Sequence, residues 1–327
     1  MADFRFENIH LVLGEPNPHI REGLKAALFA NGFRGITDCH SIERLVDVLD
    51  NPSVDVVLCD VDLPGGSFCD LVHRMRHNTL GRNPFVLTLA TTGDPNLAMV
   101  RQVIDAGVDD LLVKPLAMDV LLERIGNFAR GRKPFVVTHD YIGPDRRKDP
   151  RPGEPPKTEL IEVPNPLRSK VVGGTDLVNL QRMIDNATVR LNEHKMERYS
   201  VQVGFLVTRI VAFYDGAGSI EELVGDLDRL LFIGEDLSRR LRGTNYAHVA
   251  ELALSLTALV GRIQDLPATP DHVDIGLLGK LAQAIRRAFS ADQQGAVTAQ
   301  AISDTLSEFA ALHKSLPAAP DDGPLGD

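Results

Sequence analysis

The first 130 residues alternate between short apolar runs and segments in which apolar residues recur at helical spacing. The apolar runs predict five strands, at residues 9–13, 34–39, 54–59, 85–90 and 110–113. The segments that follow them predict five helices, at residues 20–31, 42–49, 69–76, 96–106 and 118–129. Strands and helices that alternate in this order build a parallel sheet covered on both faces, so we expect an α/β doubly wound fold.

Residues 175–317 carry a different pattern, in which apolar residues recur at alternating spacings of three and four. Stripes of this kind are typical of helices that bury one face against other helices, so we expect an all-α helical bundle. The stripes lie at residues 177–191, 220–237, 249–263, 275–285 and 302–312. The nearly continuous apolar run at residues 201–214 predicts a buried helix or a strand.

Prolines gather between these two parts, from Gly143 to Pro166, and favour an extended, exposed linker after a short strand near residues 134–141. The mixed-charge segment DRRKDPR at residues 145–151 is expected to be solvated, and the YIGP segment before it could dock onto the first domain. The predicted organisation is an α/β domain, a linker, a helical domain and a flexible tail, at residues 1–130, 131–174, 175–317 and 318–327.

Charge and composition exclude several classes of protein. The chain has 35 Lys and Arg against 45 Asp and Glu, a net charge of −10 and no tryptophan, so we expect no nucleic-acid partner. No apolar run reaches the roughly 18 residues that cross a bilayer, and residues 1–10 lack the segments of a signal peptide. We therefore expect a cytoplasmic protein without membrane insertion, in which Cys39, Cys59 and Cys69 are reduced thiols.

Residues suited to phosphoryl chemistry follow four of the predicted strands: Glu15, Asp60, Thr91 or Thr92, and Lys114. The carboxyl ends of parallel strands meet at one edge of a sheet, so these side chains should converge. A carboxylate there can act as a nucleophile, and a second one can hold a hard cation such as Mg²⁺. The lysine ammonium can pair with a phosphoryl oxygen, and a threonine hydroxyl can hydrogen-bond another.

The segments CDVDLPGG (59–66) and AGVDDLLVKP (106–115) resemble the receiver domain of two-component response regulators. The family shows an aspartate with a proline four residues later, here Asp60 and Pro64. It also shows a lysine-proline pair after the fifth strand, here Lys114 and Pro115, in which the proline is cis. The resemblance extends over about residues 7–130 and implies a flavodoxin-like fold.

The resemblance also implies roles for individual residues. Asp60 would be the phosphoacceptor for a partner histidine kinase, and Lys114 the cation that binds the phosphoryl group. Glu15, Asp60 and the backbone carbonyl of Asp62 would bind Mg²⁺. The hydroxyl of Thr91 or Thr92 would respond to phosphorylation; counting back from Lys114 favours Thr92, whereas the LAT pattern favours Thr91.

Two further positions depart from the family pattern. The pair of adjacent acids after the first strand aligns with Gly14 and Glu15, so one acid is missing, which should weaken Mg²⁺ binding. The aromatic residue that usually lies three before the lysine is Leu111. A degenerate receiver that acts as an adaptor without phosphorylation therefore stays open as an alternative.

We expect a response regulator that signals through a helical protein-interaction or dimerisation module and is not an enzyme in its own right. Its partners would be the kinase and a downstream protein or a second copy. A phosphorelay intermediate is a second alternative, because histidine phosphotransfer domains are helical bundles. Its candidate histidines are His194, His248 and His313, although no HxxKG motif accompanies them. Asp109 and Asp110 are expected to end the turn before the fifth strand.

Overall fold

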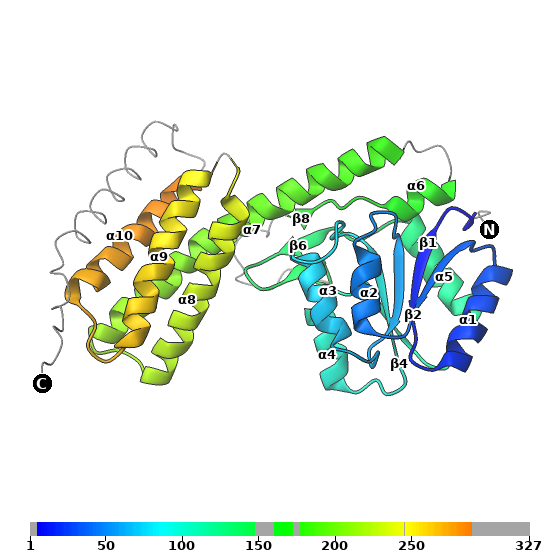
Figure 1. Cartoon of the computed structure of the whole chain (residues 1–327), viewed down its shortest axis with the longest axis horizontal. Helices are drawn as coiled ribbons and strands as arrows, with labels where there is room; N and C mark the ends of the chain where they lie inside the picture. The colour runs from blue at the N-terminus through cyan, green and yellow to red at the C-terminus, as the bar shows by residue number, and fades with distance from the viewer. Residues whose placement is uncertain (1–4, 148–159, 173–176, 245, 290–327) are drawn as a thin grey trace, which may run out of the picture. The chain divides into compact units, whose positions relative to one another are not determined.

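The computed structural model describes residues 5–147, 160–172, 177–244 and 246–289. The chain forms two compact units that divide between Asn192 and Glu193. Each unit has cores of its own and is described separately below (Figure 1).

The first unit contains a five-stranded parallel sheet in the order β2-β1-β3-β4-β5, as the alternating pattern predicts. Its strands are β1 (His10–Gly14), β2 (Gly35–Cys39), β3 (Val56–Asp60), β4 (Leu87–Thr92) and β5 (Asp110–Val113). The helices between and after them are α1 (Pro18–Ala30), α2 (Ile42–Leu49), α3 (Phe68–Arg76), α4 (Leu97–Asp105) and α5 (Met118–Arg130). The bounds of α2 and β5 are those predicted, and the other elements shift by one or two residues.

Helices cover both faces of this sheet, and each face has a core of its own, because successive strand residues point to opposite sides. Val12 and Val57 face α2, α3 and α4, whereas Leu11 and Leu58 face α1 and α5. Side-chain oxygens cap the first turns of four helices and fix where they begin. These caps are Asn17, Ser41, Ser67 and Asn96.

The segment after α5 differs from the extended linker that its prolines suggest. It forms a small antiparallel sheet, in the order β7-β6-β8, followed by helix α6 (Pro166–Val172). The strands are β6 (Phe135–Val137), β7 (Ile142–Pro144) and β8 (Leu160–Ile161). Pro144 is tolerated because β7 is an edge strand. The side of β7 that faces away from β6 has no neighbouring strand, so no N–H is required there. Phe135 packs with Phe85 of the first unit and with the first half of α7, which buries both aromatic rings.

A buried ion-pair network anchors this small sheet at the amino-terminal ends of β4 and β5. Arg76 is 0% exposed, and its Nη2 lies 2.8 Å from Asp109 Oδ2. Nη2 of Arg132 lies 2.8 Å from the other oxygen of Asp109. Burial opposes ionisation of Asp109, but the guanidiniums of Arg132 and Arg76 outweigh it and lower its pKa. Asp109 therefore does more than end a turn, since it joins the segment after α5 to the sheet.

Two further contacts hold the same segment in place. Gly143 of β7 packs so closely on Gly107 that a Cβ on Gly143 would lie 2.7 Å from the Cα of Gly107. The YIGP segment therefore docks on the turn between α4 and β5. Arg146 donates hydrogen bonds to the backbone oxygens of Val108 and Asp109, so the start of the DRRKDPR segment contacts the protein, whereas the sequence predicts a solvated segment. The rest of DRRKDPR, residues 148–151, lies outside the described residues.

The second unit is helical, as the apolar stripes predict. Its helices are α7 (Leu177–Tyr214), α8 (Ile220–Leu241), α9 (Ala247–Asp265) and α10 (His272–Ala288). Helix α7 crosses the division between the units: Leu180 and Leu191 belong to a core of the first unit, and Met196 and Ile210 to that of the second. The apolar run at 201–214 is helical. The predicted stripe at 302–312 and the tail at 318–327 lie outside the described residues.

The core of the helical unit also buries charged groups. Lys195 of α7 is 1% exposed, and its Nζ lies 3.5 Å from Oδ2 of Asp236 of α8. The same carboxylate accepts hydrogen bonds from Tyr199 at 3.0 Å and from Arg240 at 2.8 Å. None of the helices in the described part of the chain has both the length and the apolar character needed to cross a membrane.

Candidate functional site

The carboxyl ends of β1, β3 and β5 bring Glu15, Asp60 and Lys114 together. Nζ of Lys114 lies 2.6 Å from Glu15 Oε2 and forms a second ion pair with Asp60 Oδ2. Glu15 is 2% exposed and Asp60 is 4% exposed, so both carboxylates are buried at the edge of the sheet. Three residues that are far apart in the sequence thus form one cluster, as the strand-end argument predicts.

Backbone amides hold the remaining oxygen of each carboxylate. The N–H of Asn17 donates to Glu15 Oε1 at 2.9 Å, and the N–H of Asp62 donates to Asp60 Oδ1 at 2.8 Å. Each carboxylate therefore presents one oxygen to the backbone and the other to Lys114. Such fixed hydrogen bonds orient the carboxylates before any ligand arrives.

The electrostatics of the cluster favour a charged lysine. Burial works against the charge, but the carboxylates of Asp60 and Glu15 outweigh it and raise the pKa of Lys114. One ammonium thus faces two carboxylates, which leaves a negative site that attracts cations. The contact between Lys114 and Glu15 is the part that the sequence reasoning missed, because it assigned these residues to a phosphoryl group and a metal separately.

The two candidate threonines lie side by side at the end of β4 and are both buried. Thr91 pairs in register with Asp60 on β3, whereas Thr92 pairs with Val113, directly before Lys114. The hydroxyl of Thr92 accepts a hydrogen bond from the N–H of Asp94 at 3.2 Å. Both threonines thus lie at the carboxyl edge of the sheet, and the choice between their hydroxyls stays a prediction.

The oxygen donors present fit a hard divalent cation in kind. Glu15 and Asp60 supply carboxylate oxygens, and the backbone carbonyl of Asp62 stays a predicted ligand beside its exposed side chain. Within the described ranges, no group of three or more His, Cys, Asp or Glu side chains is arranged to hold a metal. The site therefore offers a sparse ligand set in which water would supply the remaining positions.

The loop after β5 also matches the expectation drawn from the resemblance. The Lys114–Pro115 peptide bond is cis. Leu111, at the position of the usual aromatic residue, packs partly buried against the core beneath α4. No ring is therefore present at this position to follow a movement of the threonine hydroxyl.

The candidate histidines of the helical unit lie in ordinary positions. His194 is half-buried on α7, and His248 is exposed on α9 near the ring of Tyr246. His313 lies outside the described residues. Neither of the two described histidines carries a feature that distinguishes a phosphotransfer residue from a surface residue.

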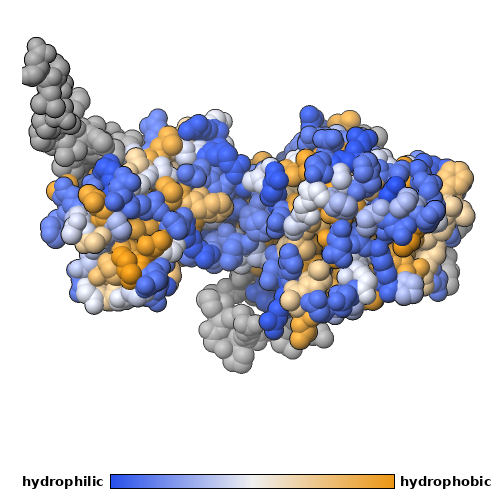
Figure 2. Space-filling view, turned by 60° about the horizontal axis from the view of Figure 1, so that its bottom comes forward, coloured by the Kyte–Doolittle hydropathy of each residue, from blue (hydrophilic) through white to orange (hydrophobic). Residues whose placement is uncertain are grey.

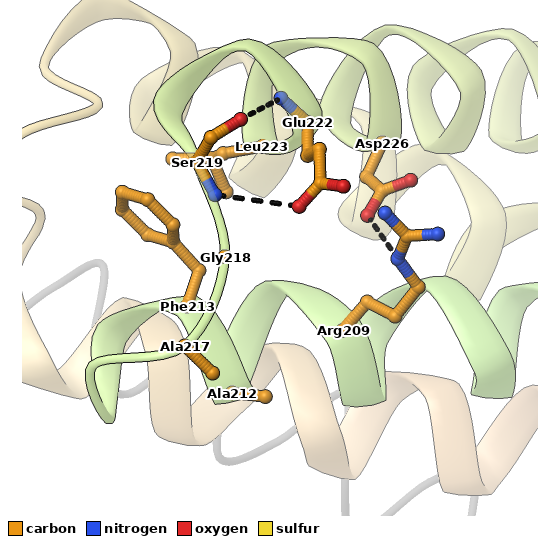
Figure 3. A pocket seen from close by; sticks show the side chains of 9 residues that line it. All are labelled: Arg209, Ala212, Phe213, Ala217, Gly218, Ser219, Glu222, Leu223 and Asp226. Carbon is orange, nitrogen blue, oxygen red and sulfur yellow. Dashed lines mark hydrogen bonds and ion pairs between the residues drawn. The ribbon is translucent and has the colours of Figure 1, made fainter.

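The helical unit has a cavity of about 250 Å³ at the turn between α7 and α8 (Figure 3). Nε of Arg209 lies 2.8 Å from Oδ2 of Asp226 across this cavity. Ser219 and Glu222 form a reciprocal capping box at the start of α8. These polar groups stabilise the helix ends and pair with one another, which accounts for them without a ligand.

Comparison with known proteins assigns the α/β part of the first unit. Residues 12–126 match the family model of the response regulator receiver domain. The chain is 26% identical over 138 residues to a cyclic di-GMP phosphodiesterase of Thermotoga maritima. The aligned region covers 42% of this chain and 36% of that protein. The chain is 28% identical over 127 residues to the phosphate regulon transcriptional regulatory protein PhoB of Escherichia coli, with coverage of 39% and 54%. The chain thus matches only about a third to a half of the length of these curated relatives.

Solved structures similar to this chain include receiver domains. The receiver domain of a Pseudomonas aeruginosa sensor histidine kinase, with magnesium in its active site cleft, is 24% identical. It covers 36% of this chain and 93% of that chain, with a TM-score of 0.33. A CheY-like receiver domain of Methanospirillum hungatei is 19% identical, with coverage of 36% and 91% and a TM-score of 0.33. Residues 12–126 are a receiver domain, and the family match ends before the small sheet and the helical unit.

Proposed function

We propose that the chain is a response regulator in which Asp60 accepts a phosphoryl group from a phosphohistidine of a partner kinase. The observation that carries this proposal is the cluster of Glu15, Asp60 and Lys114 at the carboxyl edge of a receiver sheet. A buried carboxylate beside a lysine and a second carboxylate matches what phosphoryl transfer to aspartate needs.

The chemistry follows from the positions of the carboxylate oxygens. An oxygen of Asp60 attacks phosphorus, the P–N bond to the kinase histidine breaks, and the imidazole leaves with that electron pair. The N–H of Asp62 keeps the other oxygen of Asp60 fixed during the attack. Lys114 turns from its carboxylate partners toward the phosphoryl oxygens, whose negative charge increases. A Mg²⁺ ion bound by Glu15, Asp60 and the backbone carbonyl of Asp62 would neutralise further charge on the same oxygens.

The response follows from the new dianion on Asp60. Its oxygens offer acceptors to the hydroxyl of Thr91 or Thr92, which would draw the end of β4 toward the site. A shift of one hydroxyl can bias the receiver between two arrangements of its surface loops. The receiver is a signalling domain, and the proposal assigns no turnover of a free substrate to it.

The helical unit is the proposed output, through contact with a downstream protein or a second copy. Large apolar side chains are exposed on its helices, among them Val201 and Phe205 on α7 and Phe232 on α8. Figure 2 shows apolar patches among hydrophilic ones on the surface of this unit. A net charge of −10 supports a protein partner over a nucleic acid, and the proposed site of action is the cytoplasm.

Phosphorylation of the full chain tests this proposal. Acetyl phosphate with Mg²⁺ should add one phosphoryl group, detected by intact-protein mass spectrometry, and Asp60→Asn should abolish the addition. Asp105→Asn is the matched control, because it alters an exposed carboxylate at the end of α4 and should leave phosphorylation intact. Wild-type protein that takes up no phosphoryl group from acetyl phosphate or a kinase phosphohistidine would favour the phosphorylation-independent adaptor. A phosphoryl group that moves from Asp60 to a histidine of the helical unit would favour the phosphorelay intermediate.

A further inference from the structure

The residue at the position of the missing acid lies between two cysteines. In the sheet, Gly14 of β1 pairs with Cys39 of β2 on one side and with Cys59 of β3 on the other. Residues paired in register on parallel strands point to the same face, so both thiols lie on the face that a side chain at position 14 would occupy. Both cysteines belong to the core beneath α2 and α3 and are buried.

The thiol of Cys59 fills the space that a side chain at Gly14 would need. A Cβ at Gly14 would lie 2.6 Å from Cys59 Sγ and 3.2 Å from Cys59 Cβ. It would also lie 3.2 Å from Cδ2 of Leu63, which follows β3. A contact of 2.6 Å between carbon and sulfur is far inside their van der Waals separation, so one of the two groups must move.

The position of the sulfur is fixed by its surroundings. Cys59 is 0% exposed, and its Sγ donates a hydrogen bond to the backbone oxygen of Asp60 at 3.3 Å. A rotation of the thiol away from Gly14 would break this bond and push the sulfur into a packed core. The atoms nearest to a Cβ at Gly14, from a thiol side chain and a leucine methyl, also offer no partner for a carboxylate.

We propose that Cys59 is a specificity-determining residue of the cation site, because its thiol excludes an acid at position 14 and so limits the site to two carboxylates. Glu15 and Asp60 then share the single ammonium of Lys114, which balances half of their charge without a metal. The consequence is a low affinity for divalent cations, set by a residue that touches no cation. This inference rests on the proposed function only in taking Mg²⁺ as the cation.

A double-mutant cycle on the full chain tests the proposal. Gly14→Asp alone should lower the midpoint of thermal unfolding and leave the Mg²⁺ affinity, measured by calorimetric titration, unimproved. Cys59→Ala alone should leave that affinity within about twofold of wild type. Gly14→Asp combined with Cys59→Ala should raise the affinity by roughly tenfold, since a third carboxylate then faces a divalent ion. Gly23→Asp is the charge control, because a Cβ at exposed Gly23 meets no atom within 4 Å.

A second pair of variants tests the packing alone and needs no metal. Gly14→Ala should lower the unfolding midpoint in wild-type protein and should be tolerated when Cys59 is Ala. Equal losses in both backgrounds, or a Gly14→Asp protein that is stable and binds Mg²⁺ more tightly by itself, would overturn the proposal. Neither result depends on whether Asp60 accepts a phosphoryl group, so the proposal and the proposed function can fail separately.

Discussion

Lys195 should make the stability of the helical unit depend on pH in a direction unusual for a lysine with a carboxylate partner. Burial lowers its pKa from an ordinary 10.5 to about 7, and the nearby guanidinium of Arg240 adds to the effect. Asp236 opposes this shift but does not outweigh it. Between about pH 7 and pH 10.5, the folded unit therefore binds fewer protons than the unfolded chain.

The sign and size of the effect follow from proton linkage. Burial of the protonated lysine lowers the free energy of unfolding by its full amount below about pH 7. This loss of stability falls to zero as the pH rises through 10.5. Since one pKa unit corresponds to about 1.4 kcal/mol, the full cost is at most ~5 kcal/mol. Between about pH 6.5 and about pH 9.5, the unfolding free energy should rise by at most ~3 kcal/mol.

Replacing the lysine by an apolar residue of similar length should remove this slope. Lys195→Met should be more stable than wild type at about pH 6.5 and closer to it at about pH 9.5. Asp236 keeps its bonds to Tyr199 and Arg240, so its carboxylate is not left without partners. Lys280→Met is the matched control, because Lys280 is an exposed lysine of the same unit and its loss should leave the slope unchanged.

Urea unfolding followed by tyrosine fluorescence measures this quantity, because the chain has four tyrosines and no tryptophan. Tyr199, Tyr214 and Tyr246 lie in the helical unit, so the signal reports mainly on that unit. A flat or falling wild-type stability over this pH range, or the same slope in Lys195→Met, would refute the reasoning.

Other predictions concern the segment anchored beneath the receiver sheet. Asp109→Asn leaves the buried guanidiniums of Arg76 and Arg132 with one neutral partner and should lower the free energy of unfolding in urea by ~3–5 kcal/mol. Asp110→Asn changes a partly exposed carboxylate and should lower it by less than about 1 kcal/mol. Equal costs would contradict the role of the network. Gly107→Ala forces a side chain into φ +82° and should lower the thermal midpoint, unlike Gly131→Ala in open space. Lys170→Met removes the ion pair of 2.7 Å between Lys170 and the buried carboxylate of Asp55, directly before β3. Because Lys170 lowers the pKa of Asp55, an NMR titration of the variant should show a higher pKa for Asp55.

The receiver sheet could be predicted because its strands are buried on both faces and therefore appear as continuous apolar runs. The cluster could be predicted because the parallel order places every strand end at one edge, which fixes Glu15, Asp60 and Lys114 as neighbours. The bond between Lys114 and Glu15 could not, since strand ends give proximity but not the choice of partner. The role of Cys59 also needed the strand register, which joins residues 14 and 59.

Only part of the small sheet after α5 could be predicted: the strand expected near residues 134–141 contains β6, whereas β7 and β8 were not expected. Its strands have three, three and two residues, too few to show a period of two. The prolines around them favour an extended chain, and only the edge position of β7 makes Pro144 compatible with a sheet. Nothing in the local sequence reveals that Arg76, in the basic last turn of α3, is buried and pairs with Asp109, 33 residues later.

The small sheet has a practical consequence for anyone who wishes to excise or fuse the receiver. The family match ends at residue 126, which invites a cut just after α5. Such a cut would remove Arg132 and Phe135, uncover the ring of Phe85, and leave Asp109 with half of its guanidinium partners. A fragment that retains the native interior should extend through the first half of α7, to about Asn192, where the compact unit ends.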